Sequence, residues 1–302
     1  AYEIRNCDWS SDVCSSDLLH NVIVMLELLV LGYVTVGEAA RVQTGLFAFA
    51  FQVAAQANTV VAYQLGVVLQ PIFGHLRDDP QRQVAGFLRV QRVLGLVCVP
   101  ISITQAVLAQ PLFRVAFPAD YAPAVPVFQV ISLAQAFYFA TGPSMSCLRS
   151  QRRFATFFKW QGVQFVLSVP LYWAGAQWMG ALGAALASGA AWAISAPIVV
   201  WLCTRVVAGN HLRDVLAIFV KPWLLGLPIF ALVLVAVRWL AQFGTPGDFV
   251  SLLVLGPVAA LVAIGASRLV DAEMRRLSDR AIGAVKGRLL RRRDRKSTRL
   301  NS

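Results

Sequence analysis

The chain has 302 residues, of which 58% are hydrophobic and 14% charged, and its formal net charge is +12. Soluble domains are about half apolar and about a quarter charged, so this composition, with a mean hydropathy of +0.64, excludes an ordinary soluble protein and predicts an integral membrane protein. The basic residues lie between apolar runs, so membrane topology explains the positive charge and we expect no nucleic-acid partner.

Both ends of the chain differ in character from the part between them. Residues 1–18 and 294–302 resemble translated sequencing-adapter text, and neither continues the pattern of its neighbour. We interpret both as non-native segments and expect residues 19–293 to be a fragment of a longer protein. The alternative is that Leu19–Val36 acts as an uncleaved signal anchor.

The cysteines give no sign of a metal site or a disulfide framework. Cys7 and Cys14 fall in the adapter-like segment, while Cys98, Cys147 and Cys203 lie far apart, in or beside apolar runs. This spacing predicts that the latter three pack inside the membrane domain.

The apolar runs are long enough to predict about eight membrane-spanning helices. In chain order, they are Asn21–Val36, Gly45–Pro71, Val93–Phe113, Ala124–Leu148, Phe154–Ala174, Gly180–Cys203, Val215–Leu240 and Phe249–Leu269.

Basic residues are concentrated in every second loop between the predicted spans, and in the C-terminal tail. The loops on the other side carry only Arg41, Arg114 and Arg238. Because cytoplasmic loops are enriched in Lys and Arg, this bias predicts that the richer loops and the C-terminus are cytoplasmic. The richer loops and the tail carry Arg77, Arg82, Arg89 and Arg92; Arg149, Arg152, Arg153 and Lys159; Arg205, Arg213 and Lys221; and Arg268, Arg275, Arg276, Arg280, Lys286, Arg288, Arg291, Arg292 and Arg293.

Two basic segments alternate with apolar residues. We expect Arg77–Arg92 and Asp271–Arg293 to form amphipathic helices on the cytoplasmic leaflet, with anionic lipids as their partners. Binding of another protein is the alternative.

The second span carries a stripe of polar residues, namely Gln52, Gln56, Thr59, Tyr63 and Gln70. At 100° per residue these positions fall within a stripe about 60° wide on one helix face. Lipid offers such groups no partner, so they either form hydrogen bonds between helices or line a hydrated substrate cavity.

The fifth span repeats this pattern with Gln161, Gln164, Ser168 and Tyr172, and Lys159 stands at its cytoplasmic end. Amide, hydroxyl and aromatic groups suit a sugar-binding wall, and a lysine suits a phosphate. Ordinary helix packing is the alternative for each residue. Two such stripes favour the cavity.

Glu27 is an acidic residue well inside a predicted native span. A carboxylate within the membrane is a candidate proton or cation site, so Glu27 is our candidate for the coupling ion and for the cavity wall. The alternative places Glu27 near the membrane interface.

Signals of an enzyme are missing from the sequence. The three histidines are scattered, and we find no Gly-rich phosphate loop, Walker motif, carboxylate pair or Ser/His/Asp set. We therefore expect no catalytic residues, no cofactor and no metal.

Four stretches resemble the polysaccharide-export flippases. These flippases are the O-antigen (lipopolysaccharide) and exopolysaccharide branch of the multidrug/oligosaccharidyl-lipid/polysaccharide exporter superfamily. The RSQRR segment stands where that family tends to have a short Gly/Arg turn, whereas Phe47 departs from a common tyrosine. The stretches are residues 31–54, 65–79, 111–137 and 147–187.

The resemblance implies an all-α, MATE-like transporter with two bundles of about six spans each. Residues 19–204 would form the second bundle, residues 205–270 a pair of additional spans, and residues 271–293 a basic cytoplasmic tail. Glu27 falls where relatives often have an acidic residue.

The function implied by the resemblance is the flipping of a polyprenyl-pyrophosphate-linked oligosaccharide across the bacterial inner membrane, by alternating access and without ATP. Its partners would be that lipid-linked substrate and a polysaccharide polymerase or export machinery. The alternatives are a cation-coupled multidrug antiporter of the same superfamily and a membrane glycosyltransferase or polymerase.

Overall fold

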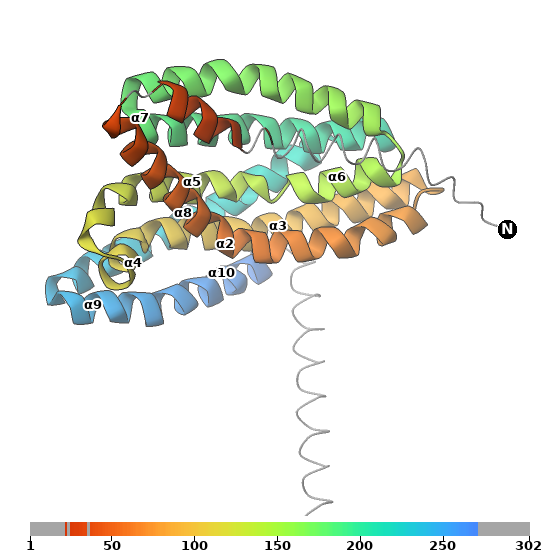
Figure 1. Cartoon of the computed structure of the whole chain (residues 1–302). Helices are drawn as coiled ribbons and strands as arrows, with labels where there is room; N and C mark the ends of the chain where they lie inside the picture. The colour runs from red at the N-terminus through yellow and green to blue at the C-terminus, as the bar shows by residue number, and fades with distance from the viewer. Residues whose placement is uncertain (1–21, 23–24, 35–36, 271–302) are drawn as a thin grey trace, which may run out of the picture.

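The computed structural model of the chain describes residues 22, 25–34 and 37–270, and every regular element in this part of the chain is a helix (Figure 1). The adapter-like segments and the basic tail Asp271–Arg293 lie outside the described residues. A short helix, Met25–Val34, comes first. It is followed by α2 (Glu38–His75), α3 (Pro80–Val107), α4 (Ala109–Ala116), α5 (Val125–Tyr138), α6 (Thr141–Ser150), α7 (Phe154–Val207), α8 (Leu212–Leu240), α9 (Thr245–Val250) and α10 (Gly256–Val270).

Helix α7 is a hairpin rather than one rod. Met179 and Gly180 have non-helical backbone angles, and Gly180 has a φ of 57°, which glycine adopts at little cost. The two arms, 154–178 and 181–207, run back along each other, as the two green ribbons of Figure 1 show. The predicted spans Phe154–Ala174 and Gly180–Cys203 correspond to these arms.

The loops predicted to share one side of the membrane meet at one end of the bundle. The Gln81 side chain donates to the Ala208 carbonyl at 3.4 Å, and the Gln151 side chain donates to the Arg77 carbonyl at 3.4 Å. Gln83 donates to Ser150 Oγ at 2.8 Å and also contacts Gln151. These contacts join the loops 76–79, 151–153 and 208–211, and α3, α7 and α8 all start there (Figure 1).

The prediction of a separate surface helix over Arg77–Arg92 is wrong. The chain turns at Leu76–Asp79, and α3 then runs without a break from Pro80 to Val107. Asp79 caps this helix by accepting a hydrogen bond from the Arg82 N–H at 3.1 Å. Val84 and Phe87 are 1% and 0% exposed, so this basic segment is buried on one side in the core of the protein.

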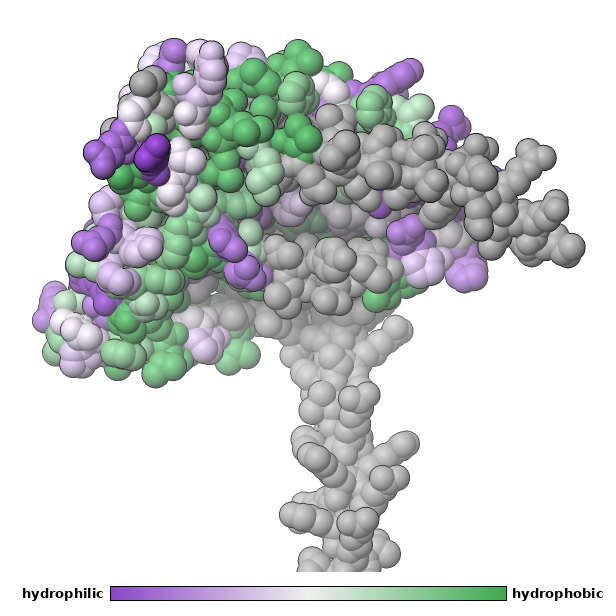
Figure 2. Space-filling model, viewed as in Figure 1, coloured by the Kyte–Doolittle hydropathy of each residue, from purple (hydrophilic) through white to green (hydrophobic). Residues whose placement is uncertain are grey.

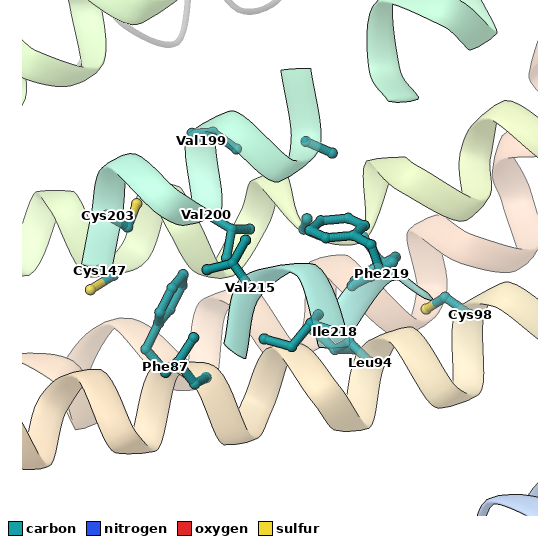
Figure 3. Packing of buried hydrophobic residues seen from close by; sticks show 14 of the residues in the cluster. Phe87, Leu94, Cys98, Cys147, Val199, Val200, Cys203, Val215, Ile218 and Phe219 are labelled. Carbon is teal, nitrogen blue, oxygen red and sulfur yellow. The ribbon is translucent and has the colours of Figure 1, made fainter. Parts of the chain in front are cut away.

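The main core lies between α3, α6, the second arm of α7 and α8 (Figure 3). Phe87 and Leu94 of α3 meet Val200 of α7 and Ile218 of α8 in this cluster. The three cysteines predicted to pack inside the domain, Cys98, Cys147 and Cys203, are all buried and free there.

The outer faces of the helices are strongly apolar. Val166, Leu232 and Leu253 are 68%, 67% and 74% exposed, which suits contact with lipid tails. Figure 2 shows hydrophobic side chains along the helices and hydrophilic ones gathered toward the two ends of the bundle.

Within the described residues, 4 helical segments are long and apolar enough to cross a membrane: Pro80–Val107, Ala119–Ser150, Phe154–Val207 and Leu212–Phe243. Shorter apolar helices lie at Met25–Val34 and Thr245–Ala259. This agrees with an all-α, multi-pass membrane protein. The count of about eight spans and the MATE-like two-bundle layout remain predictions.

Candidate functional site

The short helix Met25–Val34 packs on the α7 hairpin through apolar side chains. Leu26 and Val30 form a small apolar cluster with Tyr172 from the first arm and with Ala187 and Ala191 from the second. This cluster encloses one face of the short helix and carries Glu27 into the protein.

Glu27 is buried against α7, with 1% of its surface exposed. The Ser188 hydroxyl of the second arm donates a hydrogen bond to Glu27 Oε1 at 2.8 Å. The Tyr172 hydroxyl and the Trp192 indole lie close enough to act on the same carboxyl. Glu27 therefore joins the short helix to the second arm of the hairpin, beside Tyr172 of the first arm.

The carboxyl keeps one oxygen available. Glu27 Oε2 and the Tyr172 hydroxyl are both buried, and neither has hydrogen-bond geometry to a partner among the described residues. No described salt bridge includes Glu27. Because an unpaired buried carboxylate is strongly unfavourable, this oxygen is suited to hold a proton or a small cation.

The second predicted stripe lies on the buried face of the first arm of α7. Gln161, Gln164, Ser168 and Tyr172 are 2%, 7%, 2% and 1% exposed. The Ser168 hydroxyl lies near the Tyr172 hydroxyl, and Tyr172 lies beside Glu27. The C-terminal end of this stripe therefore reaches the Glu27 cluster, which consists of Glu27, Ser188, Tyr172 and Trp192. These four side chains of the stripe are therefore buried inside the protein, and their role as a cavity wall remains a prediction.

The first predicted stripe does not join that cluster in the described residues. Gln52 and Gln56 are exposed on α2, and Gln70 is half-buried. The side chains of Thr59 and Tyr63 lie outside the described residues. Lys159 is exposed at the start of α7, on the rim of a shallow apolar groove with Val163 and Val166. A substrate cavity shared by the two stripes remains a prediction.

Several glutamines outside the two stripes connect helices. Gln91 donates to the Ala140 carbonyl at 2.9 Å and to Ser144 Oγ at 3.2 Å, which ties α3 to α6. Gln105 donates to the Ala54 carbonyl at 3.1 Å and ties α3 to α2. Their sequence signal is a single amide inside an apolar run, which predicts a polar contact but not its partner.

Gln43 holds the turn of the α7 hairpin. Its Oε1 accepts a hydrogen bond from the Ala181 N–H at 2.9 Å, at the start of the second arm. The first N–H groups of a helix have no partner within the helix, so this side chain acts as a cap supplied by α2. Gln43 thereby fixes the hairpin that presents Ser188 to Glu27.

We predict that Gln43→Ala lowers the free energy of unfolding by about 0.5–2 kcal/mol, as expected for loss of a helix cap. The thermal unfolding midpoint of the purified protein in detergent measures this effect. Gln52→Ala, on the exposed face of the same helix, is the matched control and should leave the midpoint unchanged. Equal midpoints for both variants would contradict the capping role.

Metal-binding groups are not clustered in the described part of the chain: no set of at least 3 His, Cys, Asp or Glu residues lies close enough there to hold an ion. A cation at Glu27 would therefore be held by one carboxylate and neutral oxygens, which suits a proton or a monovalent ion better than a tightly bound metal.

The N-terminal part of the chain is similar to a known protein family. Residues 8–126 match the family described as "Polysaccharide biosynthesis protein". The matched range contains Glu27, Gln43 and all of α2 and α3, and it confirms the polysaccharide-biosynthesis relationship inferred from the sequence. It also reaches into residues 8–18, whose foreign origin remains a prediction.

A longer relative is similar to most of this chain. The chain is 22% identical over 236 residues to an "Uncharacterized membrane protein in cps region" of Klebsiella pneumoniae. The aligned part covers 78% of this chain and 49% of that relative, so the chain spans about half of the relative's length. No solved structure matches the chain.

Proposed function

We propose that this chain is part of a membrane transporter that flips a polyprenyl-pyrophosphate-linked oligosaccharide from the cytoplasmic to the outer leaflet of the bacterial inner membrane. The observation that carries the proposal is the match of residues 8–126 to polysaccharide biosynthesis proteins in a chain of apolar helices. The relative's place in a cps region supports a substrate used for surface polysaccharide, such as O-antigen or exopolysaccharide.

The Glu27 cluster supports a transporter driven by an ion gradient. A proton or cation on Glu27 Oε2 would change the charge at the contact between Met25–Val34 and both arms of α7. A helix contact with two charge states can exist in two arrangements, which is what alternating access needs. ATP hydrolysis has no part in this proposal.

The same proposal assigns roles to the parts of the chain and to the proteins that act after it. Residues 19–204 would act as the second bundle of the transporter and residues 205–270 as its additional spans, with the C-terminal tail in the cytoplasm. A polysaccharide polymerase or export machinery would receive the flipped oligosaccharide.

The experiment uses the complete reading frame that contains this chain, because the relative is about twice as long as the aligned part. The protein is reconstituted into vesicles with a fluorescent polyprenyl-pyrophosphate oligosaccharide, and a membrane-impermeant quencher reports which leaflet holds the label. We expect an imposed proton or sodium gradient to speed flipping without ATP. Flipping no faster than in protein-free vesicles would contradict the proposal.

A cation-coupled multidrug antiporter is the second candidate, because a buried carboxylate such as Glu27 also suits a cationic substrate. The same vesicles loaded with a cationic dye distinguish the two functions. Gradient-driven dye efflux without oligosaccharide flipping would favour the antiporter.

A further inference from the structure

An open apolar groove lies on the first arm of α7. Its volume is about 570 Å³, and it is lined by Lys159, Gly162, Val163, Val166 and Leu167. Val163 and Leu167 are 49% and 61% exposed. These side chains therefore still present apolar surface, and a ligand that covers it gains free energy from its burial.

Gly162 keeps the middle of this groove open. A Cβ added at Gly162 would meet nothing within 4 Å. Within the part of the chain that the structure describes, no side chain from a neighbouring helix fills this space. The groove is thus a hollow on the outside of the bundle and not a packing contact between helices.

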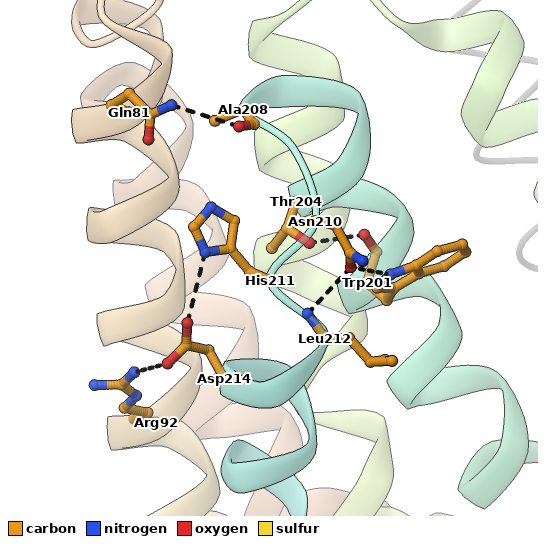
Figure 4. A network of polar contacts seen from close by, with 9 residues as sticks. All are labelled: Gln81, Arg92, Trp201, Thr204, Ala208, Asn210, His211, Leu212 and Asp214. Atoms are coloured by element: carbon orange, nitrogen blue, oxygen red, sulfur yellow. Dashed lines mark hydrogen bonds and ion pairs between the residues drawn. The ribbon is translucent and has the colours of Figure 1, made fainter.

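Lys159 is the charged residue of the groove, and it has no charged partner there. None of the described ion pairs includes Lys159, and residues 149–207 contain no Asp or Glu. Arg92 at the same end of the bundle differs, because its Nη2 contacts Asp214 Oδ1 at 3.0 Å (Figure 4). The Lys159 ammonium group is therefore available to an anion.

The groove starts near the end of the bundle that the charge bias predicts to be cytoplasmic. Helix α7 begins at Phe154, directly after the loop 151–153, and Lys159 lies in its second turn. Arg152 and Arg153 of that loop are exposed as well. A lysine can extend its ammonium group to the lipid headgroups along its apolar stem, and these basic residues attract anionic lipids.

The length of the groove is close to the depth of one leaflet. Lys159 and Leu167 are eight positions apart, or about 12 Å along a helix, and one leaflet of the hydrocarbon core is about 15 Å deep. A ligand with its anionic group at Lys159 and an alkyl chain along the groove would therefore run from the headgroups toward the middle of the bilayer. Free phosphate would leave the apolar surface uncovered.

We propose that this groove binds an anionic phospholipid of the cytoplasmic leaflet, with the lipid phosphate at Lys159 and an acyl chain against Val163, Val166 and Leu167. The lipid reaches the open groove from the side, without leaving the bilayer. The proposal goes beyond the proposed function and does not depend on transport.

Lipid binding is measured by native mass spectrometry on the protein from the complete reading frame, purified in detergent. The probes are phosphatidylglycerol and phosphatidylcholine with the same acyl chains. We expect phosphatidylglycerol to bind more tightly, and Lys159→Gln to weaken its binding about fivefold. Lys159→Arg keeps the charge and should keep binding within about twofold of the unaltered protein. Equal binding of the two lipids would overturn the proposal.

Lys221→Gln is the matched control for charge, because Lys221 is an exposed lysine on α8 that does not line the groove. It should change phosphatidylglycerol binding by no more than about twofold. An equal loss in Lys221→Gln and Lys159→Gln would overturn the proposal, since it would indicate a diffuse charge effect.

The apolar part of the groove is tested by filling it. Gly162→Leu places a side chain in the open space, so it should weaken phosphatidylglycerol binding at least about fivefold and leave the unfolding midpoint unchanged. Gly45→Leu is the matched control, because a Cβ at Gly45 of α2 also meets nothing within 4 Å, and it should leave binding unchanged. Unaltered binding in folded Gly162→Leu would overturn the proposal.

Polyprenyl phosphate serves as a further probe, because it also combines a phosphate with a hydrocarbon chain. Tighter binding of polyprenyl phosphate than of phosphatidylglycerol, lost in Lys159→Gln, would overturn the assignment to a membrane phospholipid. Failure of the flipping assay with intact phosphatidylglycerol binding would affect only the proposed function.

Discussion

Replacing Glu27 with glutamine is expected to reduce gradient-driven transport by the complete protein roughly tenfold or more, equivalent to about 1.4 kcal/mol in the free energy of the transport barrier. Glutamine has nearly the same size and can still accept the hydrogen bond from Ser188. It cannot take up a proton or provide a negative charge for a cation. The folded structure should therefore persist while the coupling to the ion gradient is lost.

The measurement is the flipping rate in vesicles with and without an imposed gradient, together with the unfolding midpoint of each variant. Glu38→Gln is the matched control, because Glu38 is an exposed carboxylate in the first turn of α2. Ser188→Ala removes the described donor to Glu27 and should weaken transport less than Glu27→Gln does. Full gradient-driven transport by a stable Glu27→Gln protein would show that the carboxylate serves packing alone.

The sequence predicts which residues belong to the Glu27 site better than it predicts how the fold brings them together. A carboxylate in an apolar run and a polar stripe at helical spacing both stand out, and they led to Glu27, Ser168 and Tyr172. Their meeting depends on the α7 hairpin, because Glu27 and Ser188 are 161 positions apart in the chain. Ser188 itself lies in a run of small residues that predicts close packing and gives no sign of a polar partner.

The incorrect prediction of a separate surface helix over Arg77–Arg92 has a physical cause. A pattern gives the face of a helix but not what covers that face. The basic segment Arg77–Arg92 has the pattern of a surface helix, yet α8 packs on its apolar side and makes it the start of α3. Gln52 and Gln56 form a regular stripe that is exposed in the described structure, whereas the isolated Gln91 is buried and joins two helices.

The largest loss of stability is expected when Gly183 is replaced by leucine. Gly175 and Gly183 lie opposite each other on the two arms of α7, and an added Cβ on either would overlap the backbone carbonyl of the other. A side chain at this contact must push the arms apart, which costs about 1–3 kcal/mol or more for overpacking. It would also move Ser188 on the second arm away from Glu27.

Purification of Gly183→Leu in detergent should therefore give little monodisperse protein and a lower unfolding midpoint, with Gly183→Ala showing a smaller loss of the same sign. Gly162→Ala is the matched control on the first arm, because a Cβ there meets nothing within 4 Å. Alanine favours a helix over glycine by about 1 kcal/mol, so this control should be neutral or slightly stabilising. An unchanged midpoint in Gly183→Ala would mean that the arms are not in backbone contact, and the link from hairpin geometry to the position of Glu27 would then fail with it.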